Sequence, residues 1–138
     1  MKKNHLKIHT IRNHITPTMG KIIDTSFSSV IAQIEIEILD IADNIYNYTS
    51  VSLIDSILIN INLWESAEWL DFTLIELADE NINKTNDCIK IAIYNLNQTK
   101  KMVSFLNWIG SISDEDTQDI KDLIEVQIKN LNDVFTFF

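Results

Sequence analysis

One stripe of apolar residues near the start of the chain constrains the fold more than any other feature. Its members recur at alternating spacings of four and three residues, which places them on one side of an α-helix. The alternation of apolar and acidic residues at 34–38 could also be interpreted as a strand, but it lies inside this longer helical pattern. The stripe therefore predicts one long helix whose buried face consists of Phe27, Ile31, Ile34, Ile38, Ile41, Ile45 and Tyr48.

Start and stop signals predict three further helices. Thr49 or Ser50 is expected to cap the second helix, and Gly110 is expected to supply the left-handed residue that ends the third. Ser113, followed three residues later by Asp116, has the pattern of a capping box for the fourth. Together these signals predict helices over roughly 19–48, 50–82, 86–109 and 114–136.

Composition and loop length then select an all-α bundle. Gly occurs twice and Pro once, which is too few for the tight turns of a β-rich fold. The connections between the predicted helices are short, and this favours antiparallel neighbours in up-down-up-down order. We predict a single four-helix bundle over residues 19–138, preceded by a short basic leader over residues 1–18.

The second predicted helix is apolar nearly all round, so its buried face must be chosen by angle. At ~100° per residue, one arc gathers most of its larger apolar side chains, and we expect this arc to face the core. Asp71 falls near the same arc but is expected to reach water, because a buried carboxylate would need a partner. The arc consists of Ile57, Trp64, Ala67, Leu70, Leu74, Leu77, Ala78 and Ile82.

Charge is distributed unevenly along the chain. The five cations of residues 1–23 precede the first acid, Asp24, so the remainder carries a formal charge of −14 within the net −9. A field of this sign repels phosphate backbones and anionic lipid, and it attracts basic proteins. We therefore expect neither nucleic acid nor membrane to be a partner, and the longest apolar stretch falls short of the ~20 residues that span a bilayer.

The sequence does not support nucleophilic catalysis. Histidines occur only in the leader, at His5, His9 and His14, so Cys88 and the serines lack an evident base. The lone Cys88 cannot form an intramolecular disulfide and is expected to be a small buried residue. With no secretory signal after the basic start, these observations predict a cytoplasmic, non-enzymatic protein without a cofactor.

Acidic residues of the second predicted helix form two pairs with the same spacing, one pair eleven residues after the other. Eleven residues are close to three helical turns, so the four carboxylates share one face, from which two aromatic side chains also project. Aromatic anchors inside a charged rim are typical of protein interfaces, although a central helix could instead bury both aromatics. We predict that this acidic face binds a basic protein partner, in the manner of adaptors, antitoxins and immunity proteins; it consists of Glu65, Glu68, Trp69, Phe72, Glu76 and Asp79.

The same carboxylates resemble the metal signature of the all-α nucleoside triphosphate pyrophosphohydrolases. Glu65 and Glu68 form a Glu-x-x-Glu motif, and Glu76 and Asp79 form the Glu-x-x-Asp motif that follows it. The resemblance implies a nucleotide hydrolase in which these four residues hold Mg²⁺, a cation that prefers carboxylate oxygens. In that family the two motifs stand on facing helices, whereas here both fall on one predicted helix.

Self-association is a further alternative. Trp108, near the end of the third predicted helix, and the terminal Phe135, Phe137 and Phe138 leave more apolar surface than four helices readily cover. The sequence thus gives three hypotheses: a basic partner on the acidic face, a metal-dependent hydrolase, or a homo-oligomer.

Overall fold

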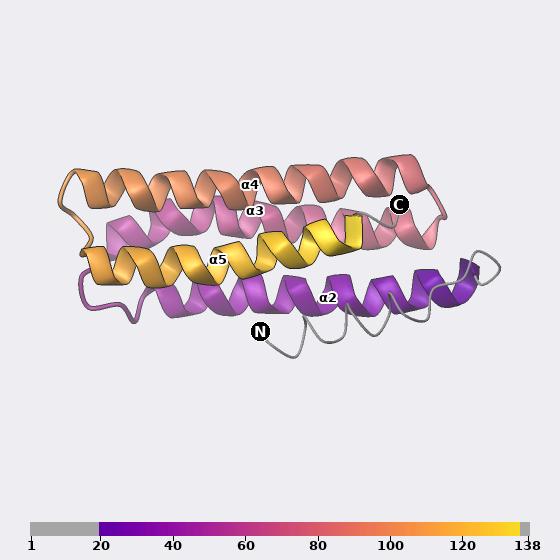
Figure 1. Ribbon diagram of the computed structural model, residues 1–138, viewed down its shortest axis with the longest axis horizontal. Coiled ribbons are helices and arrows are strands. Elements are labelled where there is room, and N and C mark those ends of the chain that lie inside the picture. Colours follow the sequence, from indigo (N-terminus) through magenta and orange to yellow (C-terminus); the bar gives the residue numbers. More distant parts are fainter. Residues whose placement is uncertain (1–19, 136–138) are drawn as a thin grey trace.

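Four α-helices packed side by side make up the described part of the protein (Figure 1). The computed structural model describes the backbone of residues 20–135 and the side chains of residues 26–135; the predicted leader lies outside this range. Each helix contacts the helices before and after it, and α2 also contacts α5, so the four form a closed ring in chain order. The predicted four-helix bundle is confirmed, with α2 (Gly20–Ile45), α3 (Leu53–Ala78), α4 (Ile82–Trp108) and α5 (Asp114–Phe135).

The apolar stripe of α2 faces the core as predicted. Phe27, Ile34 and Ile38 are almost completely buried, and the other members of the stripe within the helix are buried with them. Tyr48 lies beyond the end of α2, in the turn that leads to α3, and packs against the core while partly exposed. The longest periodic signal of the sequence therefore defines the side of α2 around which the other helices assemble.

The loop between α2 and α3 differs from the prediction. Ser52, rather than Thr49 or Ser50, caps α3 by accepting a hydrogen bond from the backbone N–H of Asp55 at 3.1 Å. Ser50 instead joins the start of α5, where its hydroxyl donates to Asp116 and accepts from the backbone N–H of Ser113. Helix α3 starts later than predicted because Ser50 bonds to the start of α5 instead of capping α3.

The boundary between α3 and α4 also differs from the prediction. Asn81 caps α4 by accepting from the backbone N–H of Lys84 at 3.3 Å, so Ile82 begins α4 instead of ending α3. The chain can reverse here because Glu80 adopts the left-handed conformation, with φ 58°. The backbone N–H groups of Glu80 and Asn81 bond back to the carbonyl groups of Leu77 and Glu76, which is a Schellman motif.

The buried face of α3 was predicted only in part. Ala67, Leu70 and Leu77 are buried as expected, but Ile57 and Trp64 are 43% and 44% exposed. Ala78 and Ile82 are exposed too, and Leu74 is partly buried. The remaining buried positions of the helix are occupied by Ser56, Ile59, Asn60, Leu63, Ser66 and Thr73.

Local hydrogen bonds explain why polar residues can occupy this face of α3. The hydroxyl groups of Ser66 and Thr73 donate to carbonyl groups of their own helix at 2.7 Å, which removes the cost of burying them unpaired. Asn60 donates across the interface to the carbonyl of Ala42 on α2 at 3.0 Å. Apolar periodicity misplaced the face because it treats such buried polar residues as solvent-facing.

The buried face and C-terminal end of α4 and the start of α5 match the sequence prediction. Ile89, Leu96, Val103 and Leu106 of α4 are buried, and Gly110 ends that helix with φ 81°. Ser113 caps α5 by accepting from the backbone N–H of Asp116 at 3.1 Å. Across the described residues, no helix is both long and apolar enough to cross a membrane.

Candidate functional site

The acidic face lies on the outer side of α3, in the half of the helix nearest its C-terminus. Glu65 and Glu68 are exposed, and Glu76 is partly buried on the side toward α4. Asp79 is exposed and forms the C-cap of the helix, with its backbone N–H bonded to the carbonyl of Ile75 at 3.1 Å. The structure thus leaves most of the predicted carboxylates available to a partner along one side of a rigid helix.

The two aromatic residues of the acidic face have different environments. Phe72 is 42% exposed, whereas Trp69 is partly buried and packs against the core. Their rings meet edge to face, with centroids 5.2 Å apart and planes at 60°. Neither alternative from the sequence holds for both residues: Phe72 has the exposure of an anchor, and Trp69 limits the orientations that the Phe72 ring can adopt.

Sequence periodicity missed two further apolar residues beside the acidic face. Trp64 was assigned to the core and is exposed, and Ile75 is 55% exposed. The sequence did contain a signal for both, because α3 carries a second stripe of mostly apolar residues with helical spacing. Its spacing is as regular as that of the buried stripe, and Glu68 is its one charged member. The second stripe consists of Ile54, Ile57, Ile61, Trp64, Glu68, Phe72 and Ile75.

Helices α2 and α3 carry no described cation. Residues 26–78, which cover α3 and the described side chains of α2, contain no lysine or arginine. Every lysine with a described side chain lies on α4 or α5, and Lys100 of α4 forms an ion pair with Glu125 of α5. Lys84, near the start of α4, lies close to the acidic face, because its charge and that of Glu76 both act on the thiol of Cys88. Described cations near the acidic face are therefore supplied by α4 and not by α3 itself.

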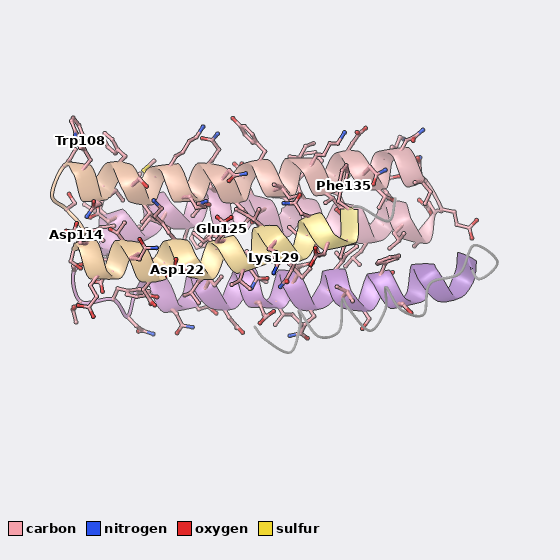
Figure 2. All side chains as sticks on the ribbon, in the orientation of Figure 1. Trp108, Asp114, Asp122, Glu125, Lys129 and Phe135 are labelled. Atoms are coloured by element: carbon pink, nitrogen blue, oxygen red, sulfur yellow. The ribbon has the colours of Figure 1, made fainter. Side chains whose placement is uncertain are left out.

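Lysines instead gather on the opposite flank of α4. A surface hollow of about 600 Å³ between α4 and α5 is lined by Lys100, Lys101 and Lys121 together with Tyr94. The exposed side of α5 is mixed in charge, with Asp122, Glu125 and Lys129 following one another along the helix (Figure 2). The acidic character of the chain is thus most one-sided on α2 and α3.

Two carboxyl groups meet beside the acidic face, where α2 packs on α3. Burial, followed by a hydrogen bond and charge repulsion from Asp71, raises the pKa of Glu35 from an ordinary 4.5 to about 7. Asp71 itself is exposed, as predicted from the need of a carboxylate for water or a partner. The contact concentrates still more acidic residues at the edge of α3.

The structure does not bring the four carboxylates of the hydrolase hypothesis together around a common point. Within residues 26–135, no three side chains among His, Cys, Asp and Glu are grouped so that they could hold a metal ion. Glu65 and Asp79 lie far apart along the same helix, fourteen residues and ~20 Å of helix rise. The two motifs lie on one helix and its C-cap, whereas the resemblance requires them on two facing helices.

The buried thiol of Cys88 has no features of a nucleophile. Cys88 lies inside α4, and burial, reinforced by the negative charge of Glu76, raises the pKa of its thiol. A raised pKa keeps the thiol protonated at neutral pH, and a protonated thiol is a poor nucleophile. Cys88 therefore acts as a small core residue, as its sequence context predicted.

Comparison with known proteins adds no relationship to this picture. No protein-family model matches the chain, and neither curated proteins nor solved structures gave a significant match. The class that the structure defines is a four-helix bundle with an acidic side, and its function must be argued from that side.

Proposed function

We propose that this protein is a non-enzymatic interaction protein that binds a basic protein partner through the acidic face of α3. The observation that carries the proposal is the exposed Phe72 between Glu68 and the carboxylates of the last turns of α3, on a helix that contains no lysine or arginine. An exposed aromatic ring gives a partner an apolar anchor, while the surrounding carboxylates select for positive charge. Adaptors, antitoxins and immunity proteins that bind basic toxins share this physical description.

The rigidity of the site supports the same proposal. The face is built on one helix, Trp69 holds the ring of Phe72 from one side, and Leu70 and Leu77 fix the helix to the core. A side chain that is already oriented loses less conformational entropy on binding than a mobile one. The partner therefore meets a preformed surface.

Photo-crosslinking from position 72 tests the proposal in cells that express the chain. Replacing Phe72 by a photoreactive phenylalanine analogue should give an adduct with a basic protein, identifiable by mass spectrometry. The matched control carries the same analogue at Tyr94, an exposed aromatic position on α4. Adducts of equal yield from both positions, or an acidic partner at position 72, would contradict the proposal.

Charge variants then measure the contribution of the carboxylates to binding of the captured partner. Glu65→Gln combined with Glu68→Gln should weaken binding by ~10-fold at low salt, since two attractive charges are removed. Raising the ionic strength should reduce this difference, because screening acts on exposed charges. Glu115→Gln combined with Asp122→Asn removes the same charge from exposed positions of α5 and should leave the affinity unchanged.

A further inference from the structure

A second exposed apolar surface lies at the end of the bundle where α3 begins and α4 ends. Trp108 is 81% exposed and projects from the last turn of α4 (Figure 2), and Phe105 stacks near it with ring centroids 6.3 Å apart. The first turns of α3 lie beside this turn because the two helices are antiparallel neighbours. We name this surface the end patch; it consists of Ile54, Ile61, Phe105, Trp108 and Ile109.

The end patch is almost free of charge, in contrast to the rest of the protein. Residues 53–64 and 102–113 together contain one charged side chain, Asp55. Acids border the patch, since Glu65 follows it on α3, and Asp114 at the start of α5 accepts a hydrogen bond from the side chain of Asn107, next to Trp108, at 2.8 Å. For a chain of net charge −9, the patch itself is a region where a second copy meets less like-charge repulsion than on the acidic face.

The size of the end patch approaches what a dimer needs. Ile54 is 71% exposed and Phe105 52%, and the five side chains together expose roughly 500 Å² when a fully exposed aromatic is counted as ~200 Å² and an isoleucine as ~150 Å². This value lies in the upper half of the range for the largest apolar patch of a monomer, ~300–600 Å². It is also more than half of the ~800 Å² that each partner buries in a standard interface.

We propose that the end patch is a homodimer interface, in which two copies of this chain pack their end patches together about a two-fold axis. Such an interface joins the same surface to itself, so it must be self-complementary, and a neutral apolar patch meets this condition whereas an acidic one does not. Asp114 and Glu65 lie at the rim of this contact, where water screens their charge. The rest of the acidic face extends away from the contact toward the C-terminus of α3.

Light scattering on the full chain, with and without a charge placed in the end patch, tests this inference. The wild-type protein should show twice the single-chain mass of 16.0 kDa at micromolar concentration. Trp108→Lys should weaken dimerisation by ~30-fold or more, as expected for a hot-spot residue, and should give the single-chain mass. Tyr94→Lys places the same charge on the same helix outside the end patch and should leave the dimer intact.

Further variants and conditions make the result decisive. Ile54→Lys, on the other helix of the patch, should also give a monomer, and circular dichroism checks that each variant remains helical. High salt should preserve or strengthen the wild-type dimer, because the contact is apolar and salt screens the repulsion between the two negatively charged subunits. A monomeric wild-type protein would overturn the inference, including one that instead binds neutral phosphatidylcholine vesicles through Trp108. Folded Trp108→Lys and Ile54→Lys variants that both remain dimeric would overturn it too. None of these outcomes affects crosslinking at position 72, so this inference and the proposed function can fail separately.

Discussion

Helices α3 and α5 both bury polar residues among apolar ones, but they differ in the side that they expose. In α5, Thr117, Gln127 and Asn130 are buried with apolar residues such as Ile124 and Leu131, and the exposed positions are polar or charged. In α3, serine, threonine and asparagine share the core side with Ile59 and Leu63, while isoleucine, tryptophan and phenylalanine remain exposed. A helix that is apolar on both sides has one side left over after folding, and that side is available for a partner.

The difference teaches where to look for function in this bundle. On α5 the solvent side is accounted for by solubility, since charged residues there need no partner. On α3 the exposed apolar residues cost solubility and have no role in the described fold, so they point to binding. Both the acidic face and the end patch use this outer side of α3, at opposite ends of the helix.

The largest effect should come from two isoleucines of α3 that stand two positions apart. Ile59 is completely buried and Ile57 is exposed. Ile59→Ala should therefore lower the free energy of unfolding by ~2–5 kcal/mol, the usual cost of truncating a buried aliphatic side chain. Ile57→Ala should cost less than ~1 kcal/mol in the same urea titration. Equal losses would mean that α3 is rotated about its axis and that its outer side is not what the structure shows.

A smaller effect is expected at the C-terminus of α3, where Glu80 occupies a left-handed position without being glycine. The conformation costs an L-residue ~1 kcal/mol or more, so Glu80→Gly should raise the free energy of unfolding by ~0.5–1 kcal/mol after the added flexibility of the unfolded chain is deducted. Gly110→Ala, at the equivalent position of α4, should lower it by about 1 kcal/mol. A Cβ at Gly110 meets no atom within 4 Å, so that loss reflects backbone conformation alone. If thermal melting shows no change in stability for either Glu80→Gly or Gly110→Ala, backbone strain at the end of α3 is ruled out.

The smallest effect is expected where α2 meets α3, and it depends on pH. Glu35 has a pKa of about 7 in the folded protein and an ordinary value of 4.5 when unfolded, so between these values the folded state binds more protons. Its contribution to stability is complete below pH 4.5 and is lost as the pH rises through 7. Glu35→Gln should therefore raise the melting temperature at pH 8 and change it little at pH 5. The gain should be a fraction of 1 kcal/mol, since water screens this partly exposed carboxyl. The same gain at both pH values would rule out the proton-linked contact with Asp71.

The fold was predictable wherever one pattern dominated a helix. The stripe of α2, the end of α4 at Gly110 and the cap of α5 at Ser113 are all confirmed. The helix boundaries around residues 45–53 and 78–82 were displaced by a few residues, because several residues could cap and only tertiary contacts, such as that of Ser50 with Asp116, select among them. The acidic face was identified from spacing, but the exposure of Trp64 and the partial burial of Trp69 were not.

By itself, the sequence determined the number of helices, their approximate extents and the concentration of acids on the second half of α3. These properties depend on spacing and composition within each segment, which local physical rules capture. Only the tertiary structure decided which side of α3 is buried and which is left for partners. The reason is that α3 has two stripes of equal regularity, and spacing alone does not show which of them is buried. The choice depends on contacts with other helices. Small side chains such as Ser66 and Ala67 pack against neighbouring helices, and Asn60 donates a hydrogen bond to a carbonyl group of α2.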